Sequence, residues 1–376
     1  MKVQAAVFRK AGEPLVVEEV ELRKPQAGEI LVKIRASGIC HSDISVQNGT
    51  MPIPPPMVLG HEGAGEVVEV GEGVTSVAVG DHVILNNVPE CGKCPQCHNP
   101  RTNLCIESGR NVLTTPVLRN SKYRPFFKTA EGKDATTLMT AGTFATHSLI
   151  DAHTVTPIPK DIPFEEAALI ACGVITGIGS THYAAHVSPG SSVAVFGIGS
   201  VGLNVIQGAK IAGATVILAL DILDSKEAVA RQFGATHFIN PSKLEGATLH
   251  SKIAEILGGS IFVDFAFEAT GNTGVLQTAV SIVHPLSGEV VAVGIPHFTS
   301  ETKFPGPTFS LGRTLRGVLF GNAKSITVTK QIVEWYKAGK IQVKPLITHR
   351  LTLQEVNKGM ELLAKGEAVR PVILFD

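Results

Sequence analysis

A glycine-rich segment, Gly197-Ile-Gly199-Ser-Val-Gly202, restricts most strongly what this chain can fold into. An apolar, β-branched run at 193–196 precedes it, and a run with helical periodicity at 201–212 follows it. A second apolar run occupies 215–220. Strand, glycine turn, helix and second strand in this order form the unit from which doubly wound parallel sheets are built. The glycines permit a tight turn and let backbone amides at the helix N-terminus approach a pyrophosphate closely.

An acidic residue, Asp221, ends the second of these predicted strands. It lies about 20 residues beyond the glycine turn, where a carboxylate accepts hydrogen bonds from the ribose 2′-hydroxyl of a dinucleotide. The same carboxylate repels a 2′-phosphate, so we expect NAD rather than NADP. A flavin dinucleotide site and a purely structural unit are the alternative interpretations. The predicted cofactor-binding residues of this unit are Gly197, Gly199, Gly202 and Asp221.

The rest of the chain divides into two kinds of pattern. From about residue 174 onward, strand-like and helix-like runs alternate, as is typical of a parallel α/β sheet. Residues 1 to about 90 instead carry short alternating runs with glycine turns between them, which predict a compact, mostly β unit. At 376 residues, two domains are the default expectation. The predicted fold class is therefore α/β, with one mostly β domain and one doubly wound domain.

Four closely spaced cysteines predict a metal site between these parts. Cys91, Cys94 and Cys97 are each separated by two residues, and Cys105 follows shortly after. Tight turns of this kind let four thiolates converge on one tetrahedral ion, and four sulfurs make a closed, structural zinc site. The alternatives are free cysteines in a loop and a zinc-ribbon module that binds nucleic acid. The balanced charge of the chain disfavours the second alternative.

A second metal centre is predicted from residues that lie far apart in the sequence. His61 stands between glycines and is followed by Glu62, whereas Cys40 and Cys172 lie elsewhere in the chain. Cys40, His61 and Cys172 together would leave a fourth position open on a catalytic zinc. Asp43 and Glu62 lie beside these ligands and are candidates to orient the imidazole. A lone cysteine is more often a small buried apolar residue, so this prediction depends on the fold.

The composition indicates a small-molecule partner. The charges balance, with 33 basic and 33 acidic residues, so no electrostatic footprint for nucleic acid or an anionic membrane is present. The N-terminus does not resemble a signal peptide, and the most apolar run, 214–223, is too short to cross a bilayer. We therefore expect a cytoplasmic protein without a membrane segment. Its six cysteines should stay reduced and serve metal binding or catalysis.

Taken together, these motifs resemble those of the zinc-containing medium-chain alcohol dehydrogenases over essentially the whole chain. The matching segments are Gly38-Ile-Cys40-His-Ser42-Asp43, Gly60-His61-Glu62-x-x-Gly65-x5-Gly71-x-x-Val74, the four-cysteine cluster, Ala171-Cys172-Gly173, the glycine turn with Asp221, and Arg313-Thr-Leu-Arg-Gly-Val-Leu-Phe-Gly321. The resemblance implies a GroES-like catalytic domain at 1–173, with a structural zinc lobe at about 88–110. It also implies a Rossmann NAD-binding domain at 174–316, a return to the catalytic domain at 317–376, and a homodimer or tetramer.

The resemblance also implies roles for individual residues. It implies two zinc ions per subunit, one catalytic and one structural, with Glu62 as an alternative ligand at the catalytic one. Ser42 occupies the position that bonds the substrate hydroxyl and begins a proton relay. The positions that touch the dinucleotide in the family are here His41, Thr176, Val201, Lys226 and Arg370. Residues near the family's substrate pocket are Asn87, Leu138 and Met139.

One departure from the family pattern affects the expected mechanism. Many members carry a histidine five residues after the first zinc cysteine as the last base of the relay, and this chain has Ser45 there. The relay proton would then leave from the cofactor ribose directly to water.

The expected reaction is reversible oxidation of an alcohol to an aldehyde or ketone with NAD; a primary alcohol is expected first, and allylic, benzylic and secondary alcohols are also candidates. A glutathione-dependent formaldehyde dehydrogenase is the nearest alternative. The stretch 46–57 contains no carboxylate to hold a charged thiol adduct, which argues against it. A non-catalytic protein that binds NAD and zinc is an alternative of another class, but the zinc ligands and the cofactor acid are all present.

Overall fold

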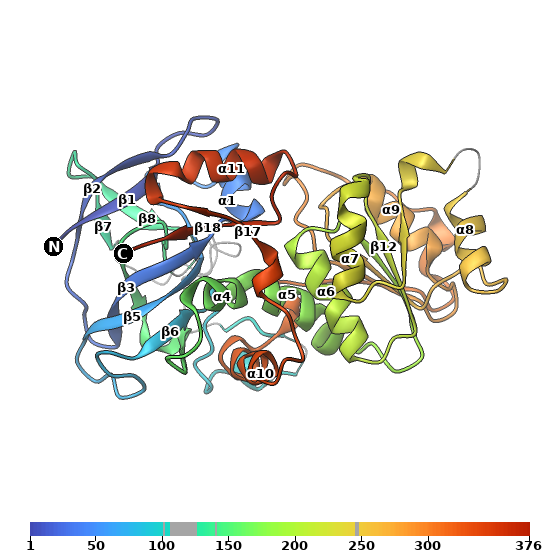
Figure 1. Cartoon of the computed structure of the whole chain (residues 1–376), viewed down its shortest axis with the longest axis horizontal. Coiled ribbons are helices and arrows are strands. Elements are labelled where there is room, and N and C mark those ends of the chain that lie inside the picture. Colours follow the sequence, from blue (N-terminus) through green and yellow to red (C-terminus); the bar gives the residue numbers. More distant parts are fainter. Residues whose placement is uncertain (101, 106–125, 140, 245–247) are drawn as a thin grey trace. The chain divides into compact units, whose positions relative to one another are not determined.

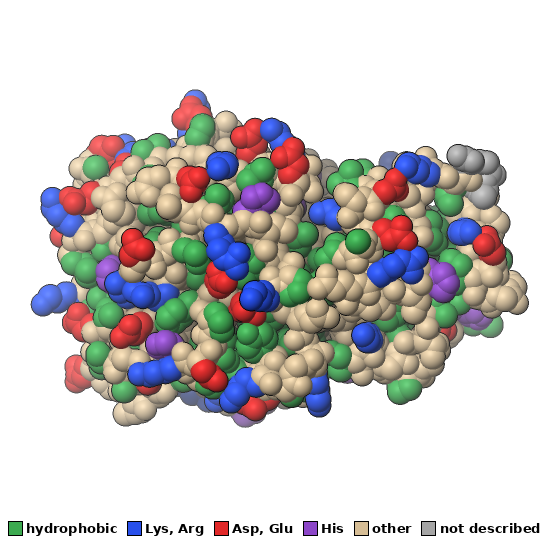
Figure 2. Space-filling model, viewed as in Figure 1, with side chains coloured by type: hydrophobic (Ala, Val, Ile, Leu, Met, Phe, Trp, Pro, Cys, Tyr) green, Lys and Arg blue, Asp and Glu red, His purple; other side chains and the backbone are tan. Residues whose placement is uncertain are grey.

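The computed structural model describes residues 1–100, 102–105, 126–139, 141–244 and 248–376 (Figure 1). By their internal contacts these residues form two compact units. The first comprises Met1–Gly173 and Lys324–Asp376, and the second comprises Val174–Ala323. Part of the predicted zinc lobe at about 88–110 lies outside the described residues. On the face in view, acidic and basic side chains are interspersed, as the balanced charge leads one to expect (Figure 2).

The first unit is built on two β-sheets. A closed barrel has the strand order β1-β2-β7-β8-β4, and a 7-stranded sheet has the order β10-β6-β5-β3-β18-β17 with β9 paired to β3. The strands are β1 (Lys2–Phe8), β2 (Val16–Leu22), β3 (Glu29–Gly38), β4 (Met57–Val58), β5 (Glu62–Val70), β6 (His82–Leu85), β7 (Phe127–Lys128), β8 (Asp134–Thr137), β9 (His147–Asp151), β10 (Val155–Ile158), β17 (Ile347–Leu351) and β18 (Arg370–Leu374). The helices are α1 (His41–Gln47), α2 (Pro95–His98), α4 (Phe164–Leu169), α10 (Ser325–Lys337) and α11 (Val356–Ala364).

The central strand pair of this unit, β3 and β5, is antiparallel and closely packed. Apolar side chains from its two faces enter two separate buried clusters, because successive residues of a strand point to opposite sides. Gly65 lies in β5 opposite Ile34, and a Cβ there would lie 2.1 Å from the Lys33 carbonyl oxygen. Only glycine therefore allows the two backbones to approach this closely. Helix α4 packs on both strands.

The second unit contains a six-stranded sheet in which every pair is parallel, in the order β13-β12-β11-β14-β15-β16. The strands are β11 (Ser192–Phe196), β12 (Val216–Leu220), β13 (His237–Ile239), β14 (Phe265–Glu268), β15 (Glu289–Ala292) and β16 (Thr314–Gly317). The helices are α5 (Ile175–Gly179), α6 (Ser200–Ile211), α7 (Glu227–Phe233), α8 (Leu249–Ile256) and α9 (Thr273–Ile282). Helix α6 packs on β11 and β12, and α9 packs on β14 and β15. This confirms the predicted doubly wound sheet.

The helix that begins after Pro163 is longer than its sequence pattern predicts. Pro163, as a residue that favours a helix start, predicts a helix over 164–171, whereas the helical run continues through Phe164–Ala184. It contains two π-helical turns, Ile170–Val174 and Ser180–Ala184, which interrupt the regular period. The run is long and apolar enough to cross a membrane, but 89% of its most apolar 18-residue stretch is buried within the protein. Such burial is expected of a core helix.

Candidate active site

The strand register of the first unit brings distant parts of the chain together. Gly38, at the end of β3, lies opposite Glu62 in β5 and opposite Val372 in β18. Cys40 follows the end of β3, and Arg370 is the first residue of β18. Because both neighbouring strands are antiparallel to β3, all three segments meet at this one end of the sheet. The sequence alone does not reveal this meeting.

Four potential metal ligands cluster at this point. One ligand atom from each of Cys40, His61, Glu62 and Cys172 lies within 4.8 Å of the others, and all four residues are buried. The Nε2 atom of His61 has no hydrogen-bond partner among the described residues. Two thiols, a carboxylate and an imidazole whose Nε2 is unpaired form a donor set that suits zinc. The cluster therefore fits the predicted catalytic metal.

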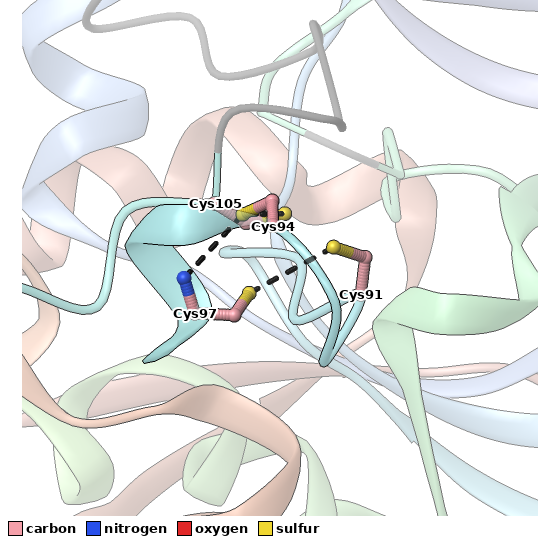
Figure 3. A group of neighbouring side chains, drawn as sticks. All are labelled: Cys91, Cys94, Cys97 and Cys105. Atoms are coloured by element: carbon pink, nitrogen blue, oxygen red, sulfur yellow. Dashed lines mark hydrogen bonds between the residues drawn. The ribbon is translucent and has the colours of Figure 1, made fainter. Parts of the chain in front are cut away.

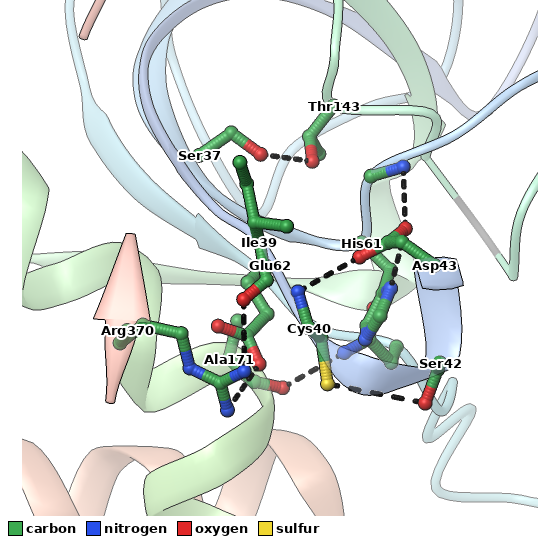
Figure 4. A network of polar contacts seen from close by, with 12 residues as sticks. Ser37, Ile39, Cys40, Ser42, Asp43, His61, Glu62, Thr143, Ala171 and Arg370 are labelled. Carbon is green, nitrogen blue, oxygen red and sulfur yellow. Dashed lines mark hydrogen bonds and ion pairs between the residues drawn. The ribbon is translucent and has the colours of Figure 1, made fainter. Parts of the chain in front are cut away.

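Asp43 holds the imidazole and the loops around it (Figure 4). Its Oδ2 accepts a hydrogen bond from the backbone N–H of Cys40 at 3.0 Å, and its Oδ1 accepts one from the backbone N–H of Gly60 at 2.9 Å. The same Oδ1 lies 3.4 Å from His61 Nδ1. A carboxylate on Nδ1 leaves Nε2 for the cluster and fixes the ring orientation. Asp43 thus links the two segments that carry Cys40 and His61.

A buried arginine balances the negative charge of the cluster. The Arg370 side chain is 2% exposed, lies 3.1 Å from Glu62 Oε1, and donates a hydrogen bond to the Ile39 carbonyl at 2.9 Å. The Arg370–Glu62 contact has ion-pair distance without hydrogen-bond geometry. Sequence reasoning missed this pair, because only the strand order places β18 beside β3. The predicted contact of Arg370 with a pyrophosphate stays a prediction.

Burial and charge shift the pKa values of these groups in opposite directions. Burial raises the pKa of Glu62 to about 8, although Arg370 partly offsets this. The hydrogen bond from Cys172 lowers the pKa of Cys40 well below its usual value, and Arg370 and His61 lower it further. The pKa of Cys172 is raised well above its usual value by its hydrogen bond to Cys40 and by burial. Of these two thiols, Cys40 is therefore the one that gives up its proton more readily.

Cys172 and Ser42 reach the cluster from helical segments. Cys172 lies in the π-helical turn that follows α4, and α4 itself packs on β3 and β5. Ser42 lies in the first turn of α1, with its Oγ 3.9 Å from Cys40 Sγ. A hydroxyl at this place is near the ligand cluster and can exchange a proton with a group bound there.

The four-cysteine cluster has the geometry of a closed metal site (Figure 3). The Sγ atoms of Cys91 and Cys97 are 3.9 Å apart, as are those of Cys94 and Cys105, and all four sulfurs lie within 4.8 Å of one another. The backbone N–H of Cys97 donates to Cys94 Sγ at 3.4 Å. Sulfur contacts of this kind support four thiolates around one zinc.

The N-terminus of α10 is anchored to this lobe. The carboxylate of Glu90 accepts hydrogen bonds from the backbone N–H groups of Ile326 at 2.9 Å and Thr327 at 3.0 Å. Lys324 Nζ donates to the Cys97 carbonyl, and Ser325 Oγ donates to the Val88 carbonyl. The first amides of a helix lack partners within it, so Glu90 acts here as an external cap.

The second unit places the predicted dinucleotide turn at the C-terminal end of β11. Asp221 accepts hydrogen bonds from the backbone N–H groups of Ile198 at 2.7 Å and Leu223 at 3.0 Å. The carboxylate is thereby held beside the glycine turn, at the edge where doubly wound sheets bind nucleotides. Lys226 and Thr176 are buried within the same unit, and Val201 lies in the first turn of α6. His41, by contrast, begins α1 of the first unit.

Comparisons with known proteins agree with this geometry. The family model "Alcohol dehydrogenase GroES-like domain" matches residues 26–160, and "Zinc-binding dehydrogenase" matches residues 200–338. The chain is 40% identical to alcohol dehydrogenase class-3 of Cereibacter sphaeroides and 39% identical to S-(hydroxymethyl)glutathione dehydrogenase of Paracoccus denitrificans, each with 100% of both chains covered. A solved structure, benzyl alcohol dehydrogenase from Acinetobacter calcoaceticus, matches with a TM-score of 0.86 and 32% identity, and 100% of both chains is covered.

The chain therefore belongs to the zinc-dependent alcohol dehydrogenase family. This confirms the resemblance seen in the sequence, and with it the GroES-like and Rossmann-like fold class. The two donor clusters fit the structural and catalytic zinc ions of such an enzyme.

Proposed function

We propose that this protein oxidises a carbinol group with NAD at the Cys40–His61–Cys172 cluster. The observation that carries the proposal is the buried set of four ligand atoms within 4.8 Å, with His61 Nε2 unpaired. Zinc held there supplies Lewis acidity toward an alcohol oxygen, and NAD supplies a hydride acceptor. Cys40, His61 and Cys172 would hold the ion, and Glu62 would be an alternative ligand or a charge balanced by Arg370.

The chain's own residues would handle the proton and the cofactor. Ser42 Oγ accepts the proton of the substrate hydroxyl and passes it outward. Ser45 stands where many family members carry a histidine, so with NAD bound the relay would lack that base and its proton would have to reach water directly. Asp43 keeps the imidazole in its tautomer. Cofactor contacts are assigned to the glycine turn and Asp221, together with His41, Thr176, Val201, Lys226 and Arg370.

The first substrate to consider is S-(hydroxymethyl)glutathione. The name of the Paracoccus denitrificans relative favours it, at 39% identity over whole chains. This similarity weighs against the preference for simple alcohols that the carboxylate-free stretch 46–57 suggests. A benzylic or other primary alcohol is the second candidate, because the matched solved structure is a benzyl alcohol dehydrogenase. Both substrates present a carbinol to the same cluster, so the chemistry is shared.

Absorbance of NADH at 340 nm distinguishes these possibilities. Turnover of formaldehyde that requires glutathione supports the first candidate, whereas turnover of benzyl alcohol without glutathione supports the second. NAD should be preferred to NADP because of Asp221. Ser42→Ala should lose nearly all turnover, and Ser45→Ala, a matched change three residues away, should retain it. Absence of zinc-dependent NADH formation with either substrate class contradicts the proposed function.

The two contact units would be the domains of this enzyme, the first catalytic and the second for NAD, in a cytoplasmic homodimer or tetramer. Support for self-association comes from β16, which ends the parallel sheet and can accept a further strand. Large apolar side chains are exposed near it, namely Leu286, Phe309 and Leu311. Light scattering after gel filtration tests this, since a monomer at micromolar concentration would contradict it.

A further inference from the structure

A buried asparagine contacts the turn that carries Cys172. Asn87 follows β6, is 2% exposed, and donates a hydrogen bond from Nδ2 to the Ala171 carbonyl at 3.1 Å. Ala171 directly precedes Cys172, and both lie in the π-helical turn Ile170–Val174. The hydrogen bond thus spans 84 positions of sequence to reach the residue beside a proposed metal ligand.

The π-helical turn gives a reason for a side-chain donor at this place. Where a helix changes from bonds four residues apart to bonds five residues apart, the regular pairing of amides and carbonyls is broken. Buried carbonyls that such a turn leaves without a backbone amide take a donor from a side chain. The amide of Asn87 supplies one, and it thereby fixes the turn from which the Cys172 side chain projects.

The residue before Asn87 is fixed by buried hydrogen bonds of its own. This residue, Asn86, donates to Thr156 Oγ1 at 2.8 Å and accepts from Thr329 Oγ1 at 3.0 Å, and all of these side chains are buried. The Oδ1 atom of Asn87 has no partner among the described residues. Rotating the amide would replace a donor with an oxygen facing the Ala171 carbonyl. The orientation of Asn87 is therefore set by its bond to Ala171.

We infer that Asn87 is a positioning residue, which holds the Cys172 sulfur in place for the catalytic metal by bonding the preceding carbonyl. The inference rests on the proposed function in one respect, that zinc binds this cluster. Residues that orient ligands typically change metal affinity by about 10–100-fold when they are replaced. Loss of the Asn87 amide should therefore loosen the catalytic zinc and leave the four-cysteine zinc unaffected.

The test replaces Asn87 with an apolar side chain of similar size, Asn87→Leu, and with Asn87→Ala. The control is Thr329→Val, which removes a buried hydrogen bond to the adjacent Asn86 but leaves the Ala171 contact. Zinc release from the full-length holoenzyme is followed with a chromogenic chelator, which resolves the two zinc ions by rate. The absorption spectrum of protein substituted with cobalt at the catalytic site reports the ligand geometry directly.

In both Asn87 variants we expect one zinc ion to be released about 10–100-fold faster than in the wild type, and the cobalt absorption spectrum to shift. Thr329→Val should show neither change. If Asn87→Leu does not fold, the smaller Asn87→Ala is judged by the same criteria. Wild-type release and an unchanged cobalt spectrum overturn the inference, and so does equal acceleration in Thr329→Val. A spectral shift in a protein that oxidises no alcohol would refute the proposed function and leave the inference standing.

Discussion

Two glycines of the dinucleotide turn should respond to alanine in opposite ways. A Cβ at Gly202 would lie 1.9 Å from the Gly197 carbonyl oxygen, far inside the 3.0 Å below which real Cβ contacts essentially never fall. A Cβ at Gly199 would meet nothing within 4 Å, and the backbone there is extended, with φ −85° and ψ −168°. Gly202 therefore serves the packing of α6 on β11. Gly199 leaves open space where a pyrophosphate would approach.

The expected magnitudes follow from these contacts. Gly202→Ala must displace backbone, and such overpacking costs about 1–3 kcal/mol. Replacing a helical glycine with alanine recovers about 0.5–1 kcal/mol, which leaves a net loss of up to about 2.5 kcal/mol. For a unit of this size, that loss lowers Tm by up to about 10 °C. Gly199→Ala creates no clash and should melt at or slightly above the wild-type temperature, because the unfolded chain loses freedom.

Affinity for NADH should also distinguish the two variants, because Gly199→Ala should weaken cofactor binding. The methyl group of Gly199→Ala would occupy the path of the pyrophosphate, and we expect NADH to bind at least about tenfold more weakly, or about 1.4 kcal/mol. Differential scanning fluorimetry measures Tm, and quenching of NADH fluorescence measures Kd. Unchanged NADH affinity in Gly199→Ala, or a Tm loss equal to that of Gly202→Ala, would refute this assignment of the two glycines.

Three further changes test the first unit. Arg370→Met leaves Glu62 buried without its cation, which costs about 3–5 kcal/mol when the carboxylate stays charged. The pKa of Glu62 in the folded protein is about 8, above its ordinary 4.5, so this carboxyl is charged at pH 9 and mostly neutral at pH 6. The loss in free energy of unfolding, measured with denaturant, should therefore be larger at pH 9 than at pH 6. An equal loss at both pH values would contradict the pairing. Glu165→Gln should cost under about 1 kcal/mol at pH 7. Arg350 lowers the pKa of Glu165 in the folded protein, so the stability difference between Glu165→Gln and the wild type should vanish as the pH falls through this lowered pKa. A stability difference that persists in acid would contradict the pairing of Glu165 with Arg350. Cys97→Ser should weaken the four-sulfur site and speed amide hydrogen exchange in the first turn of α10. Exchange in this turn at the wild-type rate would show that the four-cysteine lobe does not anchor the helix.

Local sequence patterns predicted a large part of this architecture. The strand at Ser192–Phe196, the turn at Gly197 and the acid at Asp221 lie where the pattern placed them, because strand, turn and helix signals act over a few residues. The four cysteines also converge as predicted, since their spacing in one short segment leaves few other arrangements. Irregular helices were harder to predict. The π-helical turns around Cys172 disturb the period on which such predictions depend.

The sequence by itself therefore determined the residue types, the zinc-compatible motifs and the strand–turn–helix unit, all of which depend on neighbours along the chain. Only the tertiary structure decided which distant residues meet. Cys40 and His61 come together because β3 and β5 pair with Gly38 opposite Glu62, and Arg370 joins them because β18 lies on the other side of β3. Strand order and register arise from burial of whole faces rather than from any local signal, which is why the Arg370–Glu62 pair and the Asn87–Ala171 bond appear only in the folded chain.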